Sequence, residues 1–159
     1  MIRVNKILNY SLFIQCMEEI HKAEKERIFC CHGIDHLLSV ARIMWINAME
    51  NNMGIDKEII YATALLHDIG RSRAYRHKTD HAMESGEIAQ QILAETDFNK
   101  EEIDKIIYAI IHHNDSEETT DLCSLLRTAD KQSRNCFACP AYKECYWDEN
   151  KKNKGVTVW

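Results

Sequence analysis

The stretch that decides the fold is residues 57–70, KEIIYATALLHDIG. Its apolar side chains cover almost the whole circumference of a predicted helix, so this helix has hardly a polar face. A helix of that kind lies at the centre of its domain, and a glycine such as Gly70 commonly ends a helix. The sequence therefore predicts a buried core helix over residues 57–67 that ends in two polar side chains, His67 and Asp68.

The rest of the chain also carries helical patterns. Apolar residues recur at spacings of three and four, and no stretch sustains the period of two that marks a strand. The predicted fold class is all-α, a bundle of about six to seven helices. Besides the core helix, helices are expected over residues 6–27, 35–51, 80–95, 100–113 and 122–134.

Short local signals separate these helices. Asn99 and Glu102 form a predicted capping box, which marks the start of a helix. Residues 71–79 are polar and basic and are predicted to form a loop. The polar residues 114–120 end the next helix, and an exposed tail is expected from Asp148 onward.

Composition limits the class of protein. The chain has 159 residues, of which 45% are hydrophobic and 28% charged, as expected for a single globular domain. The 20 basic and 25 acidic residues give a net charge of −5, so no overall positive field attracts a nucleic acid duplex. No run of about 18 apolar residues is present, and the first residues lack the apolar stretch of a signal peptide. We therefore expect a cytoplasmic protein with no membrane partner.

The cysteine pattern sets the C-terminal part of the chain apart. Seven cysteines is an odd number, and three of them form a C-x2-C-x5-C motif, which suits reduced thiols or metal ligands better than disulfides. We expect residues 1–135 to form the main domain and residues 136–159 to form a cysteine-containing extension packed on it. The motif residues are Cys136, Cys139 and Cys145.

This motif is a candidate thiolate site for zinc or for an iron–sulfur cluster. Such sites usually have four thiolates, and the candidates for the fourth are Cys30, Cys31 and Cys123. The alternative is that reduced thiols pack beside the neighbouring aromatic side chains. A bound group would either fix the extension in place or make it sensitive to redox conditions.

Histidines and aspartates form a second candidate site. His67 and Asp68 end the most apolar helix, where unpaired polar groups cost a few kcal/mol each. Hydrogen bonding between the two or a metal ion would remove that cost. Similar side chains lie on or beside the apolar faces of four other predicted helices: His36, His81, His113 and Asp130. So many ligand-type side chains near buried faces favour a metal centre over isolated buried histidines.

The same residues occur in the order of a known family. His36 in DHLLSV, His67 and Asp68 in LLHDIG, and Asp130 in TADK resemble the H…HD…D signature of the HD superfamily of metal-dependent phosphohydrolases. The similarity spans about residues 20–135. It implies an HD-type helical bundle in which these four residues bind one divalent metal ion. The compact pattern is most similar to the small stand-alone HD hydrolases of bacteria.

Three further histidines resemble the binuclear branch of that superfamily. This branch includes the HD-GYP and related cyclic-dinucleotide phosphodiesterases, although the sequence has no GYP motif. The resemblance implies that Asp68 bridges two ions. The implied ligands of the second ion, besides Asp68, are His81, His112 and His113.

The donor set indicates the metal and the reaction. Imidazole and carboxylate ligands suit Mn, Fe, Co, Ni or Zn, with Mg as a further candidate. Two such ions activate a water and neutralise phosphoryl oxygens, which fits hydrolysis of a phosphoester or phosphoanhydride in a nucleotide-like small molecule. Asp68 is the candidate acceptor of the water's proton, and Lys131, next to Asp130, is a second catalytic candidate. The basic candidates for binding phosphate oxygens are Arg71, Arg73, Lys78 and Lys131.

Three other functions fit parts of this pattern. One is a cyclic-dinucleotide phosphodiesterase. A non-catalytic metal- or redox-sensing HD module would use the same helices, with the cysteines as its responsive part. A helical interaction module without metal would be unaffected by chelators. Turnover by the metal-loaded protein, and its loss in an Asp68→Ala variant, separates the enzymes from the other two classes.

Overall fold

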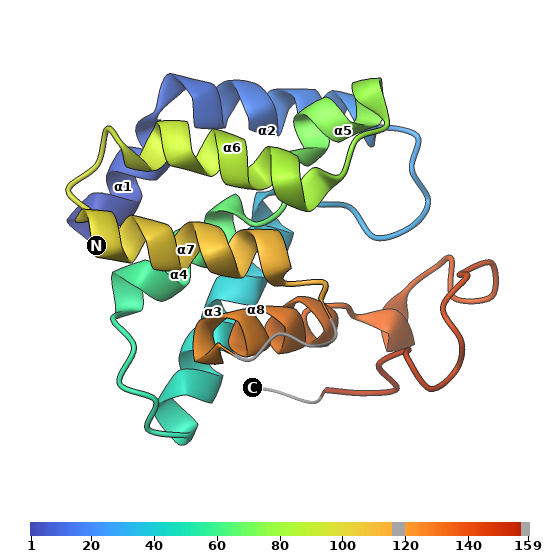
Figure 1. The fold of residues 1–159 in the computed structure, drawn as a ribbon. Coiled ribbons are helices and arrows are strands. Elements are labelled where there is room, and N and C mark those ends of the chain that lie inside the picture. The colour runs from blue at the N-terminus through green and yellow to red at the C-terminus, as the bar shows by residue number, and fades with distance from the viewer. Residues whose placement is uncertain (116–119, 157–159) are drawn as a thin grey trace.

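The computed structural model describes residues 1–115 and 120–156, so residues 116–119 of the predicted polar segment and residues 157–159 of the predicted tail lie outside the described residues. Within the described ranges the chain forms eight α-helices, one short 3-10 turn and no strand, which confirms the all-α class (Figure 1). The elements are α1 (Ile2–Asn9), α2 (Ser11–Ala23), α3 (Ile34–Glu50), α4 (Lys57–Leu66), α5 (Arg71–His77), α6 (His81–Leu93), α7 (Lys100–His112), α8 (Asp121–Gln132) and the 3-10 turn η1 (Cys136–Ala138).

The predicted core helix is α4, and it lies among the other helices (Figure 1). Its residues belong to two hydrophobic clusters. Ala62, Leu65 and Leu66 pack with residues of α1, α2, α6 and α7. Ile60 and Ala64 pack with residues of α3 and α8. The apolar circumference of α4 therefore has partners on both sides. Among the described residues, no helix has both the length and the apolarity needed to cross a membrane.

Side chains cap several helices at their first turns. The Asn99 side chain accepts a hydrogen bond from the Glu102 N–H, and the Glu102 carboxylate accepts one from the Asn99 N–H, which confirms the predicted capping box of α7. Asp56 caps α4, and Asp80 caps α6. These contacts satisfy backbone N–H groups that have no partner within their own helix.

The single helix predicted over residues 6–27 is wrong, because two helices, α1 and α2, meet at Tyr10. The Tyr10 backbone is extended (φ −76°, ψ 132°), and its N–H donates to the Ile7 carbonyl at 3.1 Å. The bend lets Val4 of α1 and Phe13 of α2 pack into the same hydrophobic cluster. No glycine or proline marks this position, so local sequence signals do not reveal the break.

The loop predicted over residues 71–79 is also wrong for most of its length, because Arg71–His77 form α5. This helix packs against α2, where the Arg76 guanidinium pairs with the Glu19 carboxylate. It ends at Lys78, whose backbone is left-handed (φ 55°). Tertiary contacts with α2 therefore make this polar segment helical.

The cysteine-containing extension continues from α8 as η1 and then as an irregular segment, drawn in orange to red in Figure 1. Asn153 Nδ2 donates to the Arg134 carbonyl at 2.7 Å, and Lys152 Nζ donates to the Tyr142 carbonyl at 3.0 Å. Lys152 is buried. The exposed tail predicted from Asp148 is therefore wrong at Lys152, because hydrogen bonds fold this segment back toward the end of α8.

Gly70 lies where the end of α4 approaches α6. A Cβ atom added to Gly70 would overlap backbone atoms of His81, Glu84 and Ser85 in the first turns of α6. The Gly70 N–H also donates to Ser85 Oγ at 2.9 Å. The missing side chain therefore permits the close approach of these two segments.

Replacing Gly70 by Ala is expected to destabilise the fold by about 3 kcal/mol, because α6 would have to move away from the end of α4. Urea unfolding monitored by circular dichroism measures this change. Gly155→Ala is the matched control, since a Cβ atom there meets nothing within 4 Å. Equal stability of Gly70→Ala and the wild type would contradict the proposed packing constraint.

Candidate metal centre

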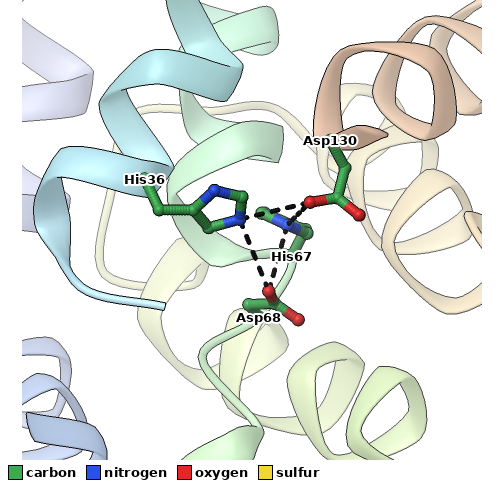
Figure 2. Close-up of side chains that lie close together, drawn as sticks. All are labelled: His36, His67, Asp68 and Asp130. Atoms are coloured by element: carbon green, nitrogen blue, oxygen red, sulfur yellow. Dashed lines mark ion pairs between the residues drawn. The ribbon is translucent and has the colours of Figure 1, made fainter. Parts of the chain in front are cut away.

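The helices bring four ligand-type side chains to one point (Figure 2). His36 lies in the first turn of α3, His67 and Asp68 directly follow α4, and Asp130 lies in the last turn of α8. One ligand atom of each residue lies within 4.8 Å of the others. His36 Nε2 is 3.2 Å from Asp130 Oδ1 and 3.7 Å from Asp68 Oδ2. We call these four residues the first group.

A second group shares Asp68 with the first. It consists of Asp68, His81 at the start of α6, and His113 directly after α7. Asp68 Oδ1 lies 3.6 Å from His81 Nε2, whereas Asp68 Oδ2 lies 3.4 Å from His67 Nε2. The two oxygens of one carboxylate therefore face two separate sets of imidazoles.

Two of the imidazoles are oriented by backbone carbonyls. His67 Nδ1 donates to the Ala64 carbonyl at 2.7 Å, and His113 Nδ1 donates to the Ile110 carbonyl at 2.6 Å. Because a carbonyl oxygen only accepts, Nδ1 carries a proton in both rings. Nε2 is then the nitrogen available to a ligand, an arrangement that metal-binding histidines commonly adopt.

The surroundings of His67 Nε2 indicate whether the first group fits a metal ion. This atom is buried and has no hydrogen-bond partner among the described residues. Such a group lowers stability unless something else pairs with it. Two imidazoles and two carboxylates are a donor set that suits a divalent transition metal. The residues of the first group therefore fit a divalent ion.

The charged side chains of the first group shift one another's pKa values. Burial disfavours a charged His67, but the carboxylates of Asp68 and Asp130 outweigh burial and raise the pKa of His67 to about 10. Burial also opposes ionisation of Asp68, yet His67, His36 and Arg71 hold the pKa of this carboxyl well below its usual range. Burial opposes ionisation of Asp130 as well, yet His36, His67 and Arg134 hold the pKa of this carboxyl well below its usual range, so both carboxylates stay ionised and are able to bind a cation.

The imidazoles of the second group have lowered pKa values, in contrast to the raised pKa of His67. Burial, together with the charge on His67, lowers the pKa of His113 to about 4. Burial and the Arg71 guanidinium lower the pKa of His81. Both rings are therefore mainly neutral at pH 7, and neutral imidazole is the form that binds metal ions.

Two arginines contact the carboxylates. Arg71 Nε donates to Asp68 Oδ1 at 2.8 Å. A guanidinium nitrogen of Arg134 donates to Asp130 Oδ1 at 3.0 Å and to His36 Nε2 at 3.1 Å. Arg71 is among the residues that the sequence predicts for phosphate binding, whereas Arg134 is not. The signal for Arg134 is its position four residues, or about one helical turn, after Asp130.

His112 and His113 are neighbours in sequence but lie in different surroundings. His113 is buried in the second group. The His112 ring lies 4.4 Å from the Tyr108 ring between centroids, and its Nδ1 is 2.6 Å from Asp115 Oδ2. The structure therefore does not bring His112 into either group.

A further imidazole, which the sequence pattern does not predict, faces the same carboxylate. His32 Nε2 lies 3.9 Å from Asp68 Oδ2, and His32 Nδ1 donates to Glu24 Oε1 at 2.5 Å. The Tyr75 hydroxyl also donates to Glu24. His32 precedes α3, so helical periodicity does not apply to it. No local sequence signal therefore identifies it, because hydrogen bonds with Glu24 set its position.

Replacing Glu24 by Gln is expected to lower the free energy of unfolding at pH 7 by about 2–3 kcal/mol. Burial would raise the pKa of Glu24, but hydrogen bonds from His32 and Tyr75 lower it from 4.5 to about 2. The ionised carboxylate therefore stabilises the fold above pH 4.5, and this stabilisation is lost as the pH falls toward 2.

Urea unfolding of wild type and Glu24→Gln at several pH values measures this effect. The difference in stability should be largest at neutral pH and should shrink as the pH falls through the acid range. A difference that does not change with pH would contradict the role of the Glu24 charge.

A cavity of about 560 Å³ adjoins both groups. Its lining includes members of each group together with His32 and Arg71. The loop between α2 and α3 and the cysteine-containing extension also contribute to the lining. This volume is typical of sites for small molecules.

The other basic candidates lie in different places. Lys131 is exposed and lines the cavity. Arg73 pairs with Glu84 at 3.4 Å and does not line the cavity. Lys78 is exposed at the end of α5 and is also absent from the lining. The structure therefore brings Lys131 and Arg71, but not Arg73 or Lys78, to the cavity.

Comparison with known proteins identifies a family pattern in the same part of the chain. The sequence model of the HD domain matches residues 33–139, which include every member of both groups. An uncharacterized protein from Clostridium beijerinckii is 42% identical over 151 residues, covering 95% of this chain and 96% of its own length. No solved structure gives a significant match.

Two more distant relatives are described as Ribonuclease Y. The protein from Mycoplasma mycoides is 29% identical over 121 residues, which cover 76% of this chain but 26% of its own length. The protein from Thermoanaerobacter pseudethanolicus is 32% identical over 98 residues, which cover 61% of this chain but 17% of its own length. This chain therefore corresponds to a minor part of either ribonuclease.

Proposed function

This chain belongs to the HD-domain family, and we propose on that basis that it is a metal-dependent phosphohydrolase. We further propose that its substrate is a phosphoester or phosphoanhydride of a small nucleotide-like molecule in the cytoplasm. The family match and the two groups of histidines and aspartates that fit divalent ions support this reading.

The main support for this proposal is the position of Asp68 between the two groups. One of its oxygens faces the imidazoles of the first group, and the other faces His81 of the second group. A carboxylate in this position is suited to bridge two ions. When bound, divalent ions polarise phosphoryl oxygens and lower the pKa of a water. The residues that we assign to the first ion are His36, His67, Asp68 and Asp130, and those assigned to the second are Asp68, His81 and His113.

The chain's own side chains supply the remaining functions. Asp68 stays ionised at neutral pH, because its pKa lies well below the usual range, and we assign to it the acceptance of a proton from a water because it belongs to both groups. Arg71 lies in the cavity lining, and its planar guanidinium suits binding of two phosphate oxygens. Lys131 also contributes a positive charge to the lining and is our second catalytic candidate.

Arg71→Gln is expected to raise KM by at least about tenfold, since a charge-assisted hydrogen bond contributes about 1.5–3 kcal/mol. Arg73→Gln is the matched control, because Arg73 pairs with Glu84 and does not line the cavity. Steady-state kinetics of both variants give the comparison. An unchanged KM in Arg71→Gln, or an equal rise in both variants, would contradict the assignment of Arg71.

The cavity favours a small substrate over a long strand. Its volume of about 560 Å³ lies in the range of small-molecule sites. Phe29, Tyr142 and Trp147 are in the lining, and aromatic rings suit the flat face of a nucleobase. The net charge of −5 provides no overall attraction for a nucleic acid polymer. We therefore favour a mononucleotide or dinucleotide over RNA.

Turnover of a panel of substrates tests the proposal. Protein purified without oxygen is loaded with Mn, Fe, Co, Ni, Zn or Mg and incubated with mononucleotides, dinucleotides, cyclic dinucleotides and short RNA. The expected result is metal-dependent hydrolysis of a small nucleotide at least about tenfold faster than hydrolysis of RNA, with loss of activity in chelator.

Other results would favour the other functions. Exclusive hydrolysis of cyclic dinucleotides would favour the phosphodiesterase alternative. Exclusive hydrolysis of RNA would contradict the small substrate, and the two ribonuclease Y relatives make RNA a necessary member of the panel. Metal binding without hydrolysis of any member would favour a non-catalytic sensing module.

A further inference from the structure

Two distant parts of the chain bring cysteines to the cavity. The loop after α2 and the extension after α8 lie on the same side of the bundle (Figure 1). Together they contribute five free cysteines to the cavity lining: Cys30, Cys31, Cys136, Cys139 and Cys145. Cys123 belongs instead to a hydrophobic core cluster with residues of α3, α4 and α8. The fold therefore places the C-x2-C-x5-C motif opposite further thiols that are more than a hundred residues away in the sequence.

The arrangement of these cysteines does not suit a single zinc ion. Around zinc, four thiolates at about 2.3 Å from the metal lie about 3.8 Å from one another. Among the described residues, the groups whose ligand atoms lie within 4.8 Å of one another contain no cysteine. An iron–sulfur cluster has several irons and sulfides between its thiolates, so its ligands lie farther apart. Cysteines spread around a cavity are therefore better suited to a cluster.

The extension is held by hydrogen bonds and has no hydrophobic core of its own among the described residues. Neither hydrophobic core cluster includes any of its residues. Phe137 and Tyr146 are exposed, at 47% and 80% of their surface, and Ala141 and Cys136 are its buried apolar residues in the described part. Short segments without a core commonly depend on a bound metal group for their structure. A cluster joined to the loop after α2 would supply that support.

Positive side chains contact the cysteine-bearing loop, and one of them, Arg134, joins it to the segment that follows α8. Arg134 donates to the Cys31 carbonyl at 3.4 Å, and Arg27 donates to the Cys30 carbonyl at 2.9 Å. Both arginines and the buried Lys152 line the cavity. Four thiolates bring more negative charge than the irons of a cluster neutralise, and these cations would offset the excess.

We propose that Cys30, Cys136, Cys139 and Cys145 bind an iron–sulfur cluster where the loop after α2 and the extension line this cavity, whereas the substrate of the proposed function binds beside the two groups around Asp68. Cys30 is the fourth ligand because the Cys31 thiol donates to the Phe29 carbonyl at 3.6 Å and is exposed. On binding, the four thiols release their protons to solvent. The cluster site is distinct from the two groups around Asp68.

The content of inorganic sulfide distinguishes the cluster from the metal ions around Asp68, because those ions bind without sulfide. The full chain is purified without oxygen and reconstituted with sulfide and equal amounts of ferrous and ferric iron, so that no further oxidant or reductant is needed. We expect about two to four inorganic sulfides per chain and a visible charge-transfer absorption. Cys139→Ser and Cys30→Ser should each lower the sulfide content at least about tenfold.

Control variants separate this site from the hydrolase centre. Cys16→Ala removes a buried cysteine outside the cavity lining and should keep the sulfide. His67→Ala should keep the sulfide while losing metal bound at the first group. Absence of sulfide in the reconstituted wild type, retention of sulfide in Cys139→Ser, or binding of zinc alone would overturn the proposal.

Thiol alkylation provides a test that needs no variant. The wild type, with and without reconstitution, is treated with iodoacetamide, and the modified cysteines are located by mass spectrometry. The four proposed ligands should react at least about tenfold more slowly in the reconstituted protein, whereas the exposed Cys31 should react equally in both. Equal protection of Cys31, or no protection of Cys139, would overturn the ligand assignment.

Discussion

An Asp68→Asn variant is expected to hydrolyse its substrate at least about a thousandfold more slowly than the wild type, a loss of about 4 kcal/mol of transition-state stabilisation. Asparagine keeps the shape of the side chain but removes its charge. Both groups depend on this one carboxylate, since Oδ2 lies 3.4 Å from His67 Nε2 and Oδ1 lies 3.6 Å from His81 Nε2. The substitution would also remove the candidate proton acceptor.

The comparison requires kcat/KM values at saturating metal for folded variants. Circular dichroism and thermal unfolding establish that Asp68→Asn is folded. Asp104→Asn is the matched control, because it makes the same chemical change at an exposed position of α7. An Asp68→Asn variant with activity within about tenfold of the wild type would contradict the central role of this carboxylate.

Divalent metal at about one hundred times its Kd is expected to raise Tm by about 5–10 °C. Metal at one hundred times its Kd stabilises the folded state by about 2.7 kcal/mol. In a chain of this size, each kcal/mol of added stability raises Tm by about 2–4 °C. The ion would pair with His67 Nε2, which is buried and has no hydrogen-bond partner among the described residues. Thermal unfolding of protein stripped with chelator, before and after addition of metal, measures the shift.

His112 and His113 form a matched pair for this experiment. His113→Ala should lose about half of the increase in Tm, because His113 belongs to the second group. His112→Ala should keep the full increase, because its ring contacts Tyr108 and Asp115 instead. An equal response of the two variants to metal would show that His113 has no special role.

The stabilisation by metal should also grow between pH 6 and pH 8. In the metal-free protein the carboxylates of Asp68 and Asp130 raise the pKa of His67 to about 10, so His67 must release a proton when a metal ion binds. Metal affinity is therefore expected to rise about tenfold for each pH unit in this range. Titration of the Tm shift with metal at several pH values gives the dependence, and stronger binding at lower pH would contradict it.

The first group could be predicted from the sequence because its members lie on or next to regular helices. His36 and Asp130 share helical spacing with apolar residues, and His67 and Asp68 end the most apolar helix of the chain. Burying the apolar face of each helix then brings these side chains together. His32 could not be found in this way, because its position comes from its hydrogen bonds with Glu24 in a segment without periodicity.

Helical spacing places His113 beside an apolar face, whereas the family resemblance implies that both His112 and His113 are ligands. Adjacent residues on a helix point about 100° apart, so both rarely face the same site, and the structure places only His113 in the second group. The bend at Tyr10 and the formation of α5 were missed for a related reason. Both depend on contacts between α1, α2 and α5 and their neighbours, which local sequence patterns do not encode.

Metal analysis of protein purified without oxygen or chelator tests the central claim most directly. The wild type is compared with His67→Ala, a variant that removes a ligand of the first group. We predict that the wild type contains about one or two more transition-metal ions per chain than His67→Ala. Equal metal content in the two proteins, with no additional uptake by the wild type on reconstitution, would contradict a metal-dependent phosphohydrolase.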